Sequence, residues 1–126
     1  SNNDRTLDLI AEYGFLYTCD LFPDDQPFPV HVEKGNLVSI PYSLELNDVI
    51  AYAQYQQTPS YYGRMIRRAF DWLSAEAKRN DTSYVMCLPL HPYLVGQPHR
   101  FAHVEEALRY VVGHPDSWCA TGEEIA

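Results

Sequence analysis

The segment SYVMCLPL, residues 83–90, constrains the fold more than any other part of the chain. Its apolar residues do not alternate with polar ones, as they would in a strand with one face in water. A short continuous apolar run is typical of a strand that is covered on both faces, as in a parallel sheet flanked by helices. We therefore expect a buried parallel strand here and an α/β architecture around it.

Two longer segments have the spacing of amphipathic helices. From Ser60, a capping residue, to Lys78 the apolar residues recur one or two turns apart, which predicts a helix over residues 60–78. A second stripe, with Glu105 and Arg109 paired four residues apart, predicts a helix over residues 99–113. The glycine at its end is a typical helix stop. These helices flank the apolar segment, as an alternation of strands and helices requires.

Shorter patterns complete the order of the elements. The strings FLYTCDLF, LVSIP and DSWCAT predict further strands at residues 15–22, 37–41 and 116–121. Asp4 precedes a predicted helix over residues 5–13, and GEEIA at the end of the sequence begins another. The resulting order is α, β, β, α, β, α, β, α. With right-handed crossovers, this order leaves a barrel or an open sheet.

Composition narrows the possible functions. Among 126 residues, 17 are acidic and 9 are basic, which gives a formal charge of −8. A phosphate backbone requires a clustered basic surface, so nucleic acids and anionic membranes are disfavoured as partners. No stretch approaches the length of a membrane span, and no signal segment opens the chain. Three cysteines without CxxC spacing are expected as reduced core residues of a cytoplasmic protein, and Phe70, Trp72, Phe101 and Trp118 as core.

Candidate site residues follow two of the predicted strands at the ends where ligands gather in α/β folds. His91 ends the apolar segment, Pro92 fixes the backbone after it, and Arg100 lies where the next helix begins. An imidazole at a rigid strand end suits acid–base chemistry near neutral pH. A partly buried structural histidine explains His91 equally well, and a surface position explains Arg100 somewhat better.

The second group of candidates lies in the string PYSLELND, which contains Tyr42, Asn47 and Asp48. Asn47 and Asp48 fit a cap for the following DVIAYAQ segment better than a substrate contact. Elsewhere, His99 and His103 have the spacing of two metal ligands on one helix face, but no third ligand is near them in the sequence. Metal binding by this pair is therefore disfavoured.

The strings LPLHPYLVGQPHRFAHVEEALRYVVGHPDSWCATGEEIA, IPYSLELND and SNNDRTLDLI together resemble the C-terminal half of the polysaccharide deacetylase-like (NodB-homology) superfamily. The likeness is to its allantoinase and cyclic-imide-hydrolase branch in particular, and it runs over nearly the whole chain. Its most specific element is Leu-x-Leu-His followed by Pro-Tyr and Gly-x-Pro-x-Arg.

The resemblance implies an α/β fold, the later part of a distorted (β/α) barrel with seven parallel strands. Residues 1–126 would form a single partial domain, truncated at both ends. It also implies that the parent protein hydrolyses a carbon–nitrogen bond. Ring opening of allantoin or a cyclic imide is expected ahead of N-deacetylation of chitin or peptidoglycan. A third alternative is a non-catalytic half domain that binds carbohydrate or a partner chain.

The resemblance also assigns roles to residues. His91 matches the histidine of the family's last motif, which would donate a proton to the leaving nitrogen or stabilise the intermediate. Tyr42, Asn47 and Asp48 fall in the loop that shapes the substrate pocket, and Arg100 is expected as a further substrate-binding residue.

The family's aspartate base and its His-x-x-x-His metal pair belong to its N-terminal half, which this sequence lacks. We therefore expect no cofactor in this chain, and a divalent metal such as zinc in the parent through residues absent here. The chain alone is expected to be inactive. The parent is expected to form a homo-oligomer in the cytoplasm and to act on a small amide, an imide or an acetylated sugar.

Overall fold

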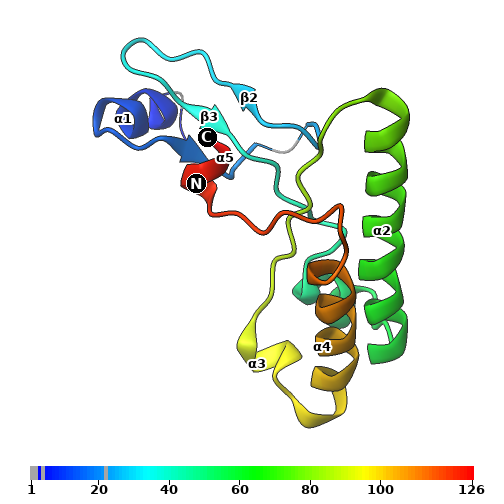
Figure 1. The fold of residues 1–126 in the computed structure, drawn as a ribbon. Coiled ribbons are helices and arrows are strands. Elements are labelled where there is room, and N and C mark those ends of the chain that lie inside the picture. Colours follow the sequence, from blue (N-terminus) through cyan, green and yellow to red (C-terminus); the bar gives the residue numbers. More distant parts are fainter. Residues whose placement is uncertain (1–2, 4, 22) are drawn as a thin grey trace. The chain divides into compact units, whose positions relative to one another are not determined.

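The structure is a computed structural model that describes residues 3, 5–21 and 23–126. These residues form two compact units (Figure 1). The first unit combines the chain up to residue 42 with residues 120–126, and the second consists of residues 43–119. Asp4, the predicted helix cap, lies outside the described residues.

The first unit holds a small mixed sheet. Helix α1 (Thr6–Glu12) precedes strands β1 (Tyr17–Thr18), β2 (Phe28–Pro29) and β3 (Val38–Ser39), and α5 (Gly122–Ile125) belongs to the same unit. The order in the sheet is β1-β3-β2, with β1 parallel to β3 and β2 antiparallel to it. The predicted first helix and the strands within residues 15–22 and 37–41 are therefore confirmed. β2 is an addition to the predicted strands and falls in a proline-rich stretch. A proline is tolerated there because the strand lies at an edge of the sheet.

Two glycines of the first unit occupy positions that a larger residue would not fit without strain or overlap. Gly14, at the end of α1, has a φ of +81°, a backbone conformation that glycine adopts without a steric penalty. Gly122 opens α5 where a Cβ atom would overlap the ring of Tyr17. Leu37 and Ile40 are buried beside β3 and form part of the core of this unit.

The second unit is helical. It contains η1, a π-helix (Ile50–Gln54), followed by α2 (Pro59–Asn80), α3 (Pro92–Val95) and α4 (Pro98–Val112). Helices α2 and α4 lie side by side (Figure 1). A Cβ atom on Gly63 of α2 would lie 2.7 Å from the carbonyl oxygen of His103 on α4, so this approach requires a glycine. The core consists of Ala51, Tyr52, Tyr62, Ile66, Val95, Val104 and Ala107.

The two long predicted helices are confirmed to within two residues at each end. The predicted cap of the first is wrong, because Thr58 and not Ser60 occupies the N-cap position of α2. The Thr58 side chain accepts a hydrogen bond from the backbone N–H of Tyr61 at 3.3 Å. Pro59 then takes the first helical position, where its fixed φ suits the helix and its missing N–H costs no hydrogen bond.

The strands predicted for residues 83–90 and 116–121 are wrong, because neither segment pairs with any described strand. A strand needs a hydrogen-bonded neighbour as well as an apolar pattern. Residues 83–90 use their apolar side chains differently, since Met86, Leu88 and Leu90 pack against the helical core. The α/β class is therefore present as a three-stranded sheet with helices. Only β1 and β3 are parallel in it, and a barrel is not seen among the described residues.

The predicted aromatic core is only partly correct. Phe70 is buried, whereas Trp72, Phe101 and Trp118 are 66%, 51% and 69% exposed. Trp72 lies two residues beyond Phe70 and therefore falls off the stripe of α2 that faces the core.

The expectation of cysteines in the core is also wrong. Cys19 and Cys119 are exposed, and only Cys87 is half-buried. Among the described residues, no helix is both long enough and apolar enough to span a membrane.

Candidate active site

His91 and Asp48 form the most constrained polar pair in the second unit. Asp48 is completely buried, and its Oδ1 lies 2.6 Å from Nδ1 of His91. Its Oδ2 accepts a hydrogen bond from the backbone N–H of His91 at 2.7 Å. The imidazole is 38% exposed. The carboxylate thus holds both the ring and the backbone of a histidine that remains accessible.

The sequence around Asp48 fixes this carboxylate in place. Asn47 precedes the helical turn, and its Oδ1 accepts a hydrogen bond from the N–H of Val49 at 2.8 Å. The N–H of Asp48 donates to the carbonyl of Pro89 at 3.3 Å, which ties the turn to the segment before His91. The capping interpretation is therefore correct for Asn47. Asp48 instead reaches a residue 43 positions further along the chain.

The backbone of His91 is also held on its C-terminal side. His91 is the extended residue directly before α3, and Pro92 begins that helix. Its carbonyl oxygen accepts hydrogen bonds from the N–H groups of Leu94 at 2.8 Å and Val95 at 3.1 Å. The ring of Tyr93 meets the imidazole edge to face at 5.6 Å. No helix is predicted at residues 92–95 from the sequence, and the structure adds this short one.

Two buried tyrosines, Tyr52 and Tyr62, pack near Asp48. The hydroxyl of Tyr62 donates to the carbonyl of Leu46 at 2.6 Å, two residues before Asp48. Burial raises the pKa of Tyr62 well above its ordinary value, and the nearby charge of Asp48 adds to this shift. Tyr62 is therefore a neutral donor at any physiological pH. Its ring packs edge to face against Tyr52 at 5.0 Å.

Tyr52 connects this group to Arg100. The guanidinium carbon of Arg100 lies 4.5 Å from the centre of the Tyr52 ring, and Nη1 donates to the carbonyl of Leu94 at 3.4 Å. Burial raises the pKa of Tyr52, the charge of Arg100 lowers it by less, and Asp48 raises it further. Tyr52 is not among the site residues predicted from the sequence, because a tyrosine in a short helical segment shows the same pattern whether it supports a site or fills a core.

The structure brings most of the predicted site residues together. Asp48 and His91 are in contact, Asn47 caps the turn that carries Asp48, and Arg100 hydrogen-bonds to the loop that begins at His91. Tyr42 is assigned to the first unit, and its role as a substrate contact stays a prediction.

A metal site is not evident in the described part of the chain. No three His, Cys, Asp or Glu residues there are grouped so that they could hold an ion. The expectation that residues outside this sequence hold a divalent metal in the parent stays a prediction.

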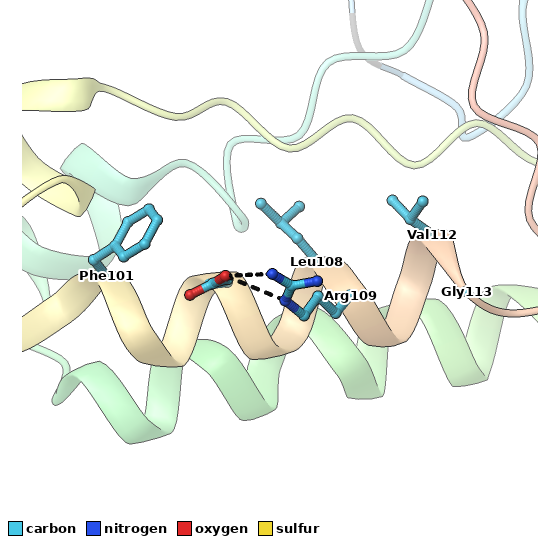
Figure 2. Close-up of a pocket in the computed structure, with 6 residues that line it drawn as sticks. Phe101, Leu108, Arg109, Val112 and Gly113 are labelled. Atoms are coloured by element: carbon cyan, nitrogen blue, oxygen red, sulfur yellow. Dashed lines mark hydrogen bonds and ion pairs between the residues drawn. The ribbon is translucent and has the colours of Figure 1, made fainter.

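A second candidate surface lies on α4 and has a different character. Figure 2 shows an open hollow lined by Phe101, Glu105, Leu108, Arg109, Val112 and Gly113. Its two charged groups neutralise each other, because Arg109 pairs with Glu105 at 2.7 Å. The hollow contains no imidazole and no nucleophile. The candidate active site is therefore the group around His91.

Comparisons with known proteins indicate the class of this fold. No family model matches the chain. A candidate polysaccharide deacetylase of Schizosaccharomyces pombe is 28% identical over 124 residues, which cover 87% of this chain and 37% of the relative. The chain therefore spans well under half the length of that protein.

Three solved structures also match nearly the whole of this chain. The crystal structure of Puue allantoinase matches 98% of this chain with a TM-score of 0.82 and 28% identity. A candidate polysaccharide deacetylase from Pseudomonas aeruginosa PAO1 matches 98% with a TM-score of 0.85 and 29% identity. One from Mycobacterium smegmatis matches 99% with a TM-score of 0.81 and 28% identity. The chain covers 42% to 44% of each structure.

These likenesses define an α/β fold of the kind found in deacetylases and allantoinase. The resemblance to the polysaccharide deacetylase-like superfamily is thereby confirmed, and the share of each relative that is covered is consistent with a C-terminal half.

Proposed function

We propose that the parent of this chain hydrolyses a carbon–nitrogen bond and that His91 acts in that reaction as a general acid–base catalyst. The observation that carries the proposal is the two-point contact of Asp48 with His91. The buried carboxylate of Asp48 contacts both Nδ1 and the backbone N–H of His91, so Nε2 is the ring nitrogen that can exchange a proton with a substrate. A histidine serving only as packing does not require this arrangement.

The reaction adds water to an amide carbonyl and breaks the bond to nitrogen. It yields a carboxylate and an amine, and the amine nitrogen must gain a proton as the bond breaks. Protonated His91 would donate that proton from Nε2, while Nδ1 keeps its own proton in a hydrogen bond to the Asp48 carboxylate, which stabilises the imidazolium. The residue that activates the attacking water is expected in the part of the parent outside residues 1–126.

The similar proteins support one substrate class over the other. Three of the four similar proteins are described as polysaccharide deacetylases, which supports hydrolysis of the acetamide group of an acetylated sugar. Ring opening of a cyclic ureide or imide is the second candidate, supported by the likeness to an allantoinase. We accordingly place deacetylation first, although the sequence alone favoured ring opening.

The test uses the full-length parent. Acetate release from acetylated chito-oligosaccharides and ring opening of allantoin are measured side by side, with and without a chelator. His91→Gln is expected to lower kcat for the true substrate at least a hundredfold, the usual size of a general acid–base contribution. His114→Gln, at the far end of α4, is the matched control and is expected to stay within twofold of wild type.

Each other outcome has a defined meaning. Turnover that survives in His91→Gln would overturn the proposed role of this residue. Loss of activity with chelator would support the predicted metal in the missing half. Binding of sugar without turnover of either substrate would favour the non-catalytic alternative. Residues 1–126 alone are expected to give no turnover, and size-exclusion chromatography of the parent tests the predicted homo-oligomer.

A further inference from the structure

Arg100 is a cation without a carboxylate partner among the residues that the structure describes. Its contacts are the ring of Tyr52 and the carbonyl of Leu94. Ion pairs with carboxylates occupy five other cationic residues, namely Lys34, Arg67, Lys78, Arg79 and Arg109. In a chain with 17 acidic and 9 basic residues, an arginine held by an aromatic ring and a carbonyl retains its capacity for an incoming anion.

The place of Arg100 in α4 supports this interpretation. Arg100 lies in the first turn of the helix, which contains no acidic residue. The N-terminal end of a helix carries a partial positive charge, so a cation there is electrostatically unfavourable. An unfavourable local choice of this kind, here a cation at the positive end of a helix, is expected mainly at functional sites. An anion beside Arg100 would remove the unfavourable interaction.

Tyr52 determines where the guanidinium lies. The ring is buried, is packed against Tyr62, and presents its face to Arg100 at 4.5 Å. A guanidinium stacked on an aromatic face loses little further freedom when it binds a planar anion. Tyr52 follows Asp48 by one helical turn, so the same short segment carries the partner of His91 and the support of Arg100.

We propose that Tyr52 is a positioning residue that holds Arg100 as the binding group for the carboxylate released by hydrolysis. This inference rests on the proposed function, because both candidate reactions release a carboxylate as the carbon–nitrogen bond breaks. The guanidinium presents paired N–H donors that match the two oxygens of a carboxylate. Leu94 links the two residues, because its N–H donates to the carbonyl of His91 and its carbonyl accepts from Nη1 of Arg100.

The experiment measures binding of acetate to the full-length parent by NMR titration, with acetamide as the neutral analogue. Arg100→Gln and Tyr52→Met are each expected to weaken acetate binding about tenfold, the size of one charge-assisted contact. Binding of acetamide should change by less than twofold. Tyr52→Phe retains the aromatic face and is expected to bind acetate like wild type.

The chain contains a matched control pair. Arg64 lies 5.6 Å from the ring centre of Tyr61 on α2, another arginine–tyrosine stack in the same unit. Arg64→Gln and Tyr61→Met are expected to leave acetate binding unchanged. The double variant of Tyr52→Met with Arg100→Gln should lose no more than either single variant, because a positioning residue acts through the group it positions.

The outcomes separate this inference from the proposed function. Acetate bound equally well by Arg100→Gln would overturn the inference, even if His91→Gln abolishes turnover. A loss in Tyr52→Phe as large as in Tyr52→Met would also overturn it, because the hydroxyl and not the ring would then matter. If Tyr52→Met does not fold, Tyr52→Trp presents a larger aromatic face and is expected to retain acetate binding. A parent that binds acetate through Arg100 but hydrolyses neither substrate would refute the proposed function alone.

Discussion

The second unit contains two histidine–aspartate pairs, which differ in their distance, in the burial of the carboxylate and in the position of the ring proton. His91 meets a completely buried Asp48 at 2.6 Å and also donates its backbone N–H to that carboxylate. His114 lies 3.6 Å from Asp116, a partly exposed carboxylate. Asp116 also pairs with Lys78 and accepts a hydrogen bond from Ser74 at 2.7 Å.

The proton position differs between the two rings as well. Nδ1 of His91 faces an acceptor-only oxygen and therefore carries the proton. Nδ1 of His114 accepts the backbone N–H of Asp116 at 3.2 Å and therefore lacks it. His114 also packs its ring against Phe70 at 5.0 Å. The comparison shows that a histidine next to an aspartate is a candidate catalyst only where the carboxylate fixes the tautomer and the ring stays accessible.

Substitution of Asp48 and of Asp116 should give the largest difference between the two pairs, in both stability and kcat. Asp48→Ala leaves the backbone N–H and Nδ1 of His91 without their acceptor, and we expect it to lower the free energy of unfolding by about 3 kcal/mol. Asp48→Asn should retain more stability but lower kcat of the parent at least a hundredfold, because the amide favours the wrong tautomer of His91.

Asp116→Ala provides the comparison and is expected to change stability and kcat only slightly. Urea unfolding measures the stability of each variant, and the hydrolysis assay measures kcat. Equal effects of Asp48→Ala and Asp116→Ala on both quantities would refute the distinction between the pairs.

A smaller effect is expected at the two buried tyrosines. Tyr62→Phe removes the donor to Leu46 beside Asp48 and should cost about 1 kcal/mol of unfolding free energy. The buried hydroxyl of Tyr52 has no hydrogen-bond partner among the described residues, so Tyr52→Phe should cost less than Tyr62→Phe. Urea unfolding of the two variants measures which of them loses more unfolding free energy. A greater loss in Tyr52→Phe would show that its hydroxyl is engaged in the full protein.

The smallest expected effect is on the pH dependence of stability, and it concerns Asp116 and its partner Lys78. A hydrogen bond from Lys78, followed by one from Ser74, lowers the pKa of Asp116 below its ordinary value of 3.8. A lowered pKa contributes stability above the ordinary value, and this contribution is lost as the pH falls through the folded value. The stability difference between wild type and Asp116→Asn should therefore shrink in acid. A difference that stays constant from pH 6 to pH 2 in thermal melts would contradict this.

The sequence predicted those parts of the molecule that depend on local pattern. Apolar spacing located α2 and α4, and the end of the apolar segment located His91. The contact of His91 with Asp48 joins residues 43 positions apart. Their positions after two predicted strands and the family resemblance made both of them candidates, but no local pattern predicts that they touch. The strand expected at residues 83–90 failed because an apolar run specifies burial and does not specify a pairing partner.

The π-helix at Ile50–Gln54 has a consequence for comparing this chain with its relatives. The N–H of Tyr55 bonds to the carbonyl of Ile50, five residues earlier, so this turn holds one residue more than an α-helical turn. An alignment with a relative that has an ordinary turn here must open a gap somewhere in the segment. The position of that gap decides whether Ala51, Tyr52 or Ala53 is matched to the residue beneath the arginine, so equivalence here has to be assigned by superposition.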